Sequence, residues 1–170
     1  MIERLANWRT FFVLLAIDLA FTILFNVYGR HYPDPAFDGR VSGFRPSEVE
    51  PILRSFAQCR QLDRYLAQVT QLDLIFPLVY SSLAAVLIVI LKPRPRWLAA
   101  LPFAAAFFDY CENFSYIALI LRYRAGETIP HPLAVFASIV QRLKWGFVFI
   151  GIAAIVVAVY GWVARRRGTG

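Results

Sequence analysis

The sequence predicts an all-α integral membrane protein, a four-helix bundle with an amphipathic helix in an outer loop. Of its 170 residues, 59% are hydrophobic, whereas soluble domains contain about 45–50% apolar residues. Four apolar runs approach the length of about 20 residues that a helix needs to cross a bilayer core. The tryptophans lie at the ends of these runs, where indole rings favour the headgroup region. They are Trp8, Trp97, Trp145 and Trp162.

The predicted spans belong to a single membrane domain, 1–170. The first run is too long for the apolar part of a typical signal peptide and has no A-x-A pattern behind it, so we interpret it as a retained span. Pro77 lies early in the second span and removes the hydrogen bond to the carbonyl group of Asp73. Residues 132–144 are partly apolar and form either a projecting part of the last helix or a separate interfacial turn. The four spans cover residues 11–28, 72–91, 97–121 and 145–164.

The outer loop, residues 29–71, is too long for a simple connection. Ser47 and Glu50 form a capping-box pattern that predicts a helix from about residue 48. Apolar residues then keep helical spacing, which indicates a short amphipathic helix on the membrane surface or over the bundle, and a second helix that runs into the next span. This segment is either a lid over the helix ends or a gate that faces a substrate. The apolar positions are Val49, Ile52, Leu53, Phe56, Leu62, Tyr65, Leu66, Val69 and Leu72.

Basic residues predict the orientation of the chain. They are dense at both termini and in the short turn after the second span, and they are spread thinly over the two outer loops. The positive-inside rule therefore predicts a multi-pass protein of the cell membrane with both termini in the cytoplasm. The net charge of +7 is interpreted as this topology signal, and no nucleic-acid partner is expected. The dense set is Arg4, Arg9, Lys92, Arg94, Arg96 and Arg165–Arg167.

Few residues are suited to redox or metal chemistry. Cys59 lies in the outer loop and Cys111 lies within a span, so a disulfide between them is not expected, and there is no C-x-x-C pair. His31 and His131 lack the spacing of metal ligands. The sequence therefore predicts neither a metal site nor a cofactor.

The candidate site consists of polar residues inside the apolar runs. A charge at the centre of a membrane helix costs about 2.5–3.5 kcal/mol on insertion scales, so intramembrane acids usually have a function. Four residues of the third span have spacings of i, i+3, i+4 and i+7 and share one face, which should point into the bundle. At about 1.5 Å per residue, Asp18 and Asp109 lie nearly level, and a second layer lies nearer the outer face. The ligand-binding or proton-relay candidates are Asp18, Asp73, Asp109, Glu112, Asn113, Tyr116 and Lys144.

Three functions fit such a buried carboxylate pocket. The first is a binding site for a proton, a hydrophobic or cationic small molecule, or a lipid. The second is an acid/base enzyme that modifies a lipid, although no residue is assigned as catalytic. The third is a non-catalytic structural or assembly subunit of a membrane complex. A cavity joining Asp18, Asp109 and Glu112 would favour a ligand, whereas carboxylates paired to Arg142 and Lys144 would favour the structural subunit. The lipid bilayer is an expected partner, and a homodimer or larger complex is compatible with each function.

The segment Asp73-Leu-Ile-Phe-Pro and the acid pair Asp109 and Glu112 give the chain a layout that resembles the EXPERA group of membrane proteins, the sterol isomerase and sigma-2 receptor type. The likeness lies in the plan of one span, a long loop and three further spans, with acids on the inner faces. The resemblance implies a cavity for a hydrophobic, often cationic, ligand. The D-x-x-E-N run at 109–113 also resembles small bacterial membrane proteins of unassigned function.

Overall fold

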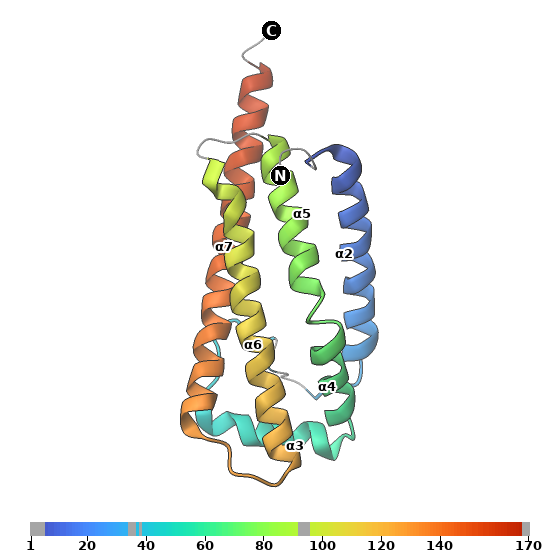
Figure 1. The fold of residues 1–170 in the computed structure, drawn as a ribbon, viewed down its shortest axis with the longest axis vertical. Coiled ribbons are helices and arrows are strands. Elements are labelled where there is room, and N and C mark those ends of the chain that lie inside the picture. Colours follow the sequence, from blue (N-terminus) through green and yellow to red (C-terminus); the bar gives the residue numbers. More distant parts are fainter. Residues whose placement is uncertain (1–5, 34–36, 38, 92–95, 168–170) are drawn as a thin grey trace.

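The computed structural model describes residues 6–33, 37, 39–91 and 96–167, and this part of the chain is all-helical, as predicted (Figure 1). Short 3-10 turns precede two of the α-helices. The elements in order are α2 (Trp8–Gly29), η1 (Pro46–Glu48), α3 (Val49–Gln58), α4 (Leu62–Gln71), α5 (Phe76–Leu91), η2 (Arg96–Ala100), α6 (Leu101–Arg124) and α7 (His131–Arg167).

Among the residues that the structure describes, two helices are long and apolar enough to cross a membrane, namely Trp8–Gly29 and the part of α7 from His131 to Arg165. A third candidate arises if α4 and α5 are counted as one span, bent by 44° at the break between them. The third predicted span, now α6, is not among them, because acidic and amide side chains lower its hydropathy. The apolar helices are thus consistent with a membrane protein, with two or three candidate spans where the sequence predicted four.

The last predicted span and the residues before it form one continuous helix, α7, of 37 residues. The alternative of a separate interfacial turn at 132–144 is therefore wrong. At about 1.5 Å per residue α7 is about 55 Å long, which exceeds the hydrocarbon thickness of about 30 Å. Its C-terminal turns project beyond the other helices (Figure 1). Small buried residues let α7 approach its neighbours closely; they include Ala134, Ala137, Ala154 and Ala158.

The helices α5, α6 and α7 pack against one another, whereas α2 lies at the edge, against α5 and α4 (Figure 1). None of the described residues of α2 is fully buried. Large apolar side chains of α2, among them Phe12, Val13 and Ile23, are more than half exposed, as expected for a helix in contact with lipid or with another membrane helix. The start of α2 and the end of α7 lie at the same end of the bundle, opposite α3.

The helix predicted in the outer loop forms as α3 and lies across the end of the bundle (Figure 1). Its apolar face, Val49, Ile52, Leu53 and Phe56, is buried as the spacing predicted. These residues join side chains of α4, α6 and α7 in one hydrophobic core, which includes the aromatic residues Phe37, Phe44, Tyr65 and Tyr116. The loop helix is therefore a cap over the bundle. We call this segment, residues 37–71 as far as they are described, the cap.

The predicted capping box of Ser47 and Glu50 does not form. Because the 3-10 turn Pro46–Glu48 precedes α3, Glu48 takes this role and accepts a hydrogen bond from the backbone N–H of Arg45 at 2.6 Å. Its other carboxylate oxygen pairs with Arg40 at 2.9 Å. Glu50 instead pairs with Arg54 on the surface of α3.

The first part of the cap is bound to α7 by direct contacts. The N–H of Phe44 donates to the hydroxyl of Ser138 at 3.1 Å, and the side-chain amide of Gln141 donates to the carbonyl of Phe37 at 2.6 Å. Gly43 between them has a positive φ of 75°, a conformation that favours glycine. The irregular part of the loop is thus held in place over α7.

Candidate functional site

The helix α6 presents its polar face to the interior of the bundle. Glu112 and Tyr116 are completely buried, and Asn113 is 3% exposed. The side chain of Asp109, one turn before Glu112, is 14% exposed. The sequence prediction that this face points inward is therefore confirmed.

Lys144 of α7 lies opposite this face and contacts both carboxylates. Its Nζ is 2.6 Å from Oε2 of Glu112 and 3.7 Å from Oδ1 of Asp109. The other oxygen of Asp109 accepts a hydrogen bond from the hydroxyl of Tyr80 on α5 at 3.0 Å. We call Asp109, Glu112, Lys144 and Tyr80 the acid–lysine cluster. It joins the three central helices through charged and polar groups.

Tyr80 was not among the predicted site residues. It lies one helical turn after Phe76, at the start of α5, and its ring packs on Phe76. Pro77 was a local signal for a kink in this part of the sequence. The hydrogen bond from Tyr80 to Asp109, however, joins residues from two different helices. Spacing along the chain carries no information on that contact.

The break between α4 and α5 is closed by side chains of α6. The amide of Asn113 donates to the carbonyl of Asp73 at 2.8 Å, and the hydroxyl of Tyr110 donates to the carbonyl of Leu74 at 2.9 Å. The carbonyl of Asp73 is the one that Pro77 was predicted to release. Asp73 thus contributes its backbone to the contact with α6, while its carboxylate accepts a long hydrogen bond from Gln68 at 3.4 Å.

Besides Asp73 and Asn113 at the break, two more of the predicted site residues lie outside the acid–lysine cluster. Tyr116 belongs to the core of the cap, where its ring stacks on Phe37 at a centroid distance of 5.0 Å. Asp18 lies on the peripheral helix α2, and among the described residues no hydrogen bond or ion pair joins its carboxylate to the cluster. Asp18 and Asp109, which were expected at nearly the same depth, are therefore not paired with each other in the described part of the chain.

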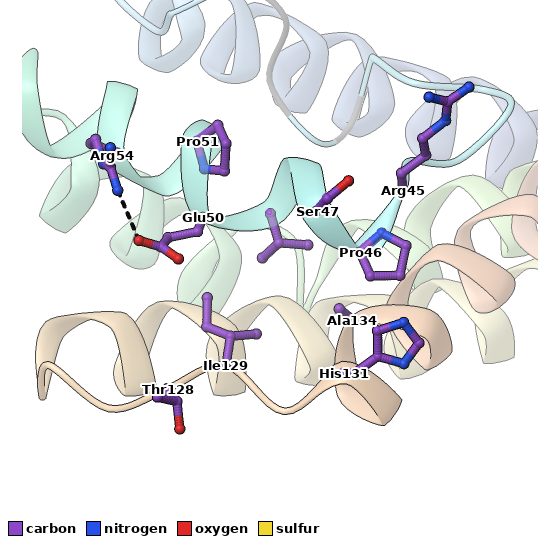
Figure 2. Close-up of a pocket in the computed structure, with 11 residues that line it drawn as sticks. Arg45, Pro46, Ser47, Glu50, Pro51, Arg54, Thr128, Ile129, His131 and Ala134 are labelled. Carbon is purple, nitrogen blue, oxygen red and sulfur yellow. Dashed lines mark hydrogen bonds and ion pairs between the residues drawn. The ribbon is translucent and has the colours of Figure 1, made fainter.

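A groove of about 790 Å³ lies between η1 and α3 on one side and the segment 128–134 on the other (Figure 2). Arg45, Arg54 and His131 line it, and within it Arg54 pairs with Glu50 at 2.8 Å. Both side chains of that pair are about 60% exposed, so the pair contributes little to stability. None of the predicted site residues lines the groove, so it is separate from the acid–lysine cluster.

The remaining candidates for chemistry are isolated in space. Within the described part of the chain, no group of three or more His, Cys, Asp or Glu residues is arranged to hold a metal ion. Cys59 and Cys111 are both free thiols. Within the same described residues, the acid–lysine cluster brings together three charged side chains that are at most 14% exposed.

Comparisons with protein-family models, with curated proteins and with solved structures gave no match to this chain. Its function is therefore inferred from the residues of the acid–lysine cluster.

Proposed function

We propose that the chain is a multi-pass membrane protein that binds a small cation, in the simplest case a proton, at the acid–lysine cluster between α5, α6 and α7. One observation carries this proposal. Two carboxylates, Asp109 and Glu112, share a single ammonium group, that of Lys144, in a place where all three side chains are at most 14% exposed.

The charge balance of these three groups supports the proposal. When all three are ionised they carry one net negative charge. A buried charge among apolar helices is costly unless another charge or a proton offsets it. Two carboxylates that meet at the same ammonium also disfavour each other's charged form. Uptake of a proton by one carboxylate, or of a small cation between them, brings the group to neutrality.

The size of the ligand follows from the position of Lys144. Its ammonium group already occupies the place beside the carboxylates that a cationic small molecule would take. The groove under α3 offers no alternative access to these carboxylates, because none of its lining residues belongs to the acid–lysine cluster. A proton adds to one carboxylate without displacing Lys144, and a small cation would sit between the two carboxylates, whereas a bulky amine or a lipid would need that side chain to move.

The same ion pair favours a second candidate function, that of a structural or assembly subunit. Glu112 is neutralised directly by Lys144 at 2.6 Å, and Asn113 ties α6 to the break before α5. Buried polar contacts of this kind can fix the register of membrane helices. In this role the cluster would hold no exchangeable cation. Nothing in the described contacts favours the lipid-modifying enzyme over these two functions.

Infrared spectroscopy of the purified full chain in lipid distinguishes the two candidates. Proton binding predicts a carboxylic-acid C=O band at neutral pH that disappears in Asp109→Asn or Glu112→Gln. A competing small cation, for which Na⁺ and methylammonium are the probes, should weaken the band in the wild type.

Asp63→Asn is the matched control, because Asp63 is an exposed acid that pairs with Arg124 at the surface. This variant should keep the band. Folded wild-type protein with no carboxylic-acid band and no response to either cation would contradict cation binding and leave the structural role.

A further inference from the structure

The peripheral helix α2 carries an acidic residue whose carboxylate has no partner among the described residues. Asp18 lies near the middle of α2, about 15 Å from Trp8 and about 16 Å from Gly29 at 1.5 Å per residue. Because α2 is one of the two helices that qualify as a span, this position is close to the midplane of a bilayer.

The surroundings of Asp18 show which side of α2 it occupies. Phe21 and Phe25, one and two turns further on, pack against Phe76 of α5 at centroid distances of 5.8 and 5.0 Å. Asp18 lies on the edge of this contact and is half-buried. Because Asp18 precedes these phenylalanines by three and seven residues, it lies toward the side of α2 that meets α5, yet its side chain stays partly exposed.

No group in the described part of the chain hydrogen-bonds to the Asp18 carboxylate or pairs with its charge. The neighbouring polar side chains on α2 are used elsewhere. The hydroxyl of Thr22 donates to the backbone carbonyl of Asp18 at 3.0 Å, and the amide of Asn26 donates to the carbonyl of Thr22 at 2.8 Å. Lipid tails offer no hydrogen-bond donor, so the carboxylate lacks a partner at the depth where it needs one most.

We propose that the edge of α2 at Asp18 is a docking surface for a transmembrane helix of another protein that carries a Lys or Arg at the same depth. Charge complementarity supports this occupant, because a cation at the midplane offsets the charge of Asp18. A second copy of this chain related by a twofold axis would place Asp18 against Asp18, which brings like charges together. The exposed apolar side chains of Leu19 and Ile23 are four residues apart and share the flank of α2 beside Asp18, so they would pack against the same partner helix.

The test uses the full chain in lipid vesicles and a host helix of leucine and alanine as the probe. A donor dye on the exposed Cys59, in a Cys111→Ala background, reports energy transfer to acceptor-labelled helices that carry Lys, Leu or Asp at their centre. The wild type should bind the lysine helix about tenfold more tightly than the leucine helix, as expected for one strong polar contact in a bilayer.

Variants of Asp18 make the test specific. The preference for the lysine helix should vanish in Asp18→Leu, and Asp18→Lys should prefer the aspartate helix. Asp109→Asn is the matched control and should keep the wild-type preference, because Asp109 is engaged with Lys144 and Tyr80 inside the bundle. Failure of the proposed cation site would therefore leave this result intact.

Two outcomes would overturn the proposal. One is equal binding of the lysine and leucine helices to the wild type. The other is energy transfer between wild-type copies that depends on Asp18 without any preference for lysine, which would identify a second copy as the occupant.

Discussion

Replacing Gly43 by alanine should detach the first part of the cap from α7. A Cβ at this position would lie 2.6 Å from Oγ of Ser138, 2.7 Å from Nε of Arg142 and 3.1 Å from the backbone carbonyl of Ser138. The arginine can move, but the Ser138 backbone belongs to α7 and cannot. The positive φ of 75° adds about 1–2 kcal/mol of strain for any residue with a Cβ. Displacing the Ser138 hydroxyl also removes the hydrogen bond to the N–H of Phe44, which is worth about 1 kcal/mol. The free energy of unfolding should fall by about 2–3 kcal/mol in total.

Gly126→Ala is the matched control for this prediction. Gly126 has a nearly equal φ of 70°, but no atom lies within 4 Å of the position that its Cβ would take. This variant should lose only the strain of about 1–2 kcal/mol. Denaturant titration of the purified proteins in detergent, together with hydrogen exchange at Phe44, measures both variants. Equal losses of stability, with Phe44 protected in both, would refute the docking of the cap through Gly43.

Three further predictions follow from single contacts. Lys144→Met should cost about 3–5 kcal/mol of unfolding free energy, because it leaves buried carboxylates without their ammonium partner, and adding Glu112→Gln should recover part of that loss in the same titration. Asn113→Leu should speed hydrogen exchange at residues 72–75 and lower stability by about 1–2 kcal/mol, because it leaves a carbonyl of the break without its donor; unchanged exchange would contradict the closing role of this amide. The N–H of Arg45 and the guanidinium of Arg40 hold the pKa of Glu48 below its ordinary 4.5. Their stabilisation of the η1 turn is therefore complete above pH 4.5 and is lost as the pH falls through the lower pKa that Glu48 has in the folded state. Proteolysis of the cap should therefore increase in acid, and Glu48→Gln should abolish that pH dependence.

Local periodicity was sufficient to predict the parts of the fold that depend on one helix at a time. The spacing of Val49, Ile52, Leu53 and Phe56 predicted the buried face of α3, because only one stripe of a short amphipathic helix can meet a core. The spacing of Glu112 within its span predicted an inward face in the same way. The release of a backbone carbonyl by Pro77 was also predictable, since it follows from covalent geometry.

Contacts between distant segments could not be predicted from such patterns. Tyr80 meets Asp109 because α5 and α6 pack in one particular register, and no local signal specifies that register. Asp18 and Asp109 were expected at similar depths, but depth along two helices says nothing about whether they are neighbours. In the structure α2 packs on α5 and α4 at the edge of the bundle.

The continuity of α7 was ambiguous for a related reason. Polar residues around Lys144 interrupt the hydropathy of a helix that nevertheless continues on both sides. They are tolerated because Lys144 faces the acids of α6 while its neighbours Leu143 and Phe149 face outward. Hydropathy averages over all faces of a helix, so it cannot separate an interruption of the helix from a polar residue that points into the bundle.

The proposed cation site requires that the acid–lysine cluster lie inside the bilayer, and its depth there can be measured. Leu143 lies next to Lys144 and is 41% exposed, so a spin label at Leu143→Cys, in a chain lacking Cys59 and Cys111, reports the depth of the cluster from the outside of α7. A label at Thr128→Cys, in the exposed connection before α7, is the reference. We expect the label at residue 143 to collide with dissolved oxygen and to be shielded from a water-soluble paramagnetic reagent, and we expect the reverse at residue 128. Equal access of the water-soluble reagent to both labels would contradict a charge cluster inside the membrane.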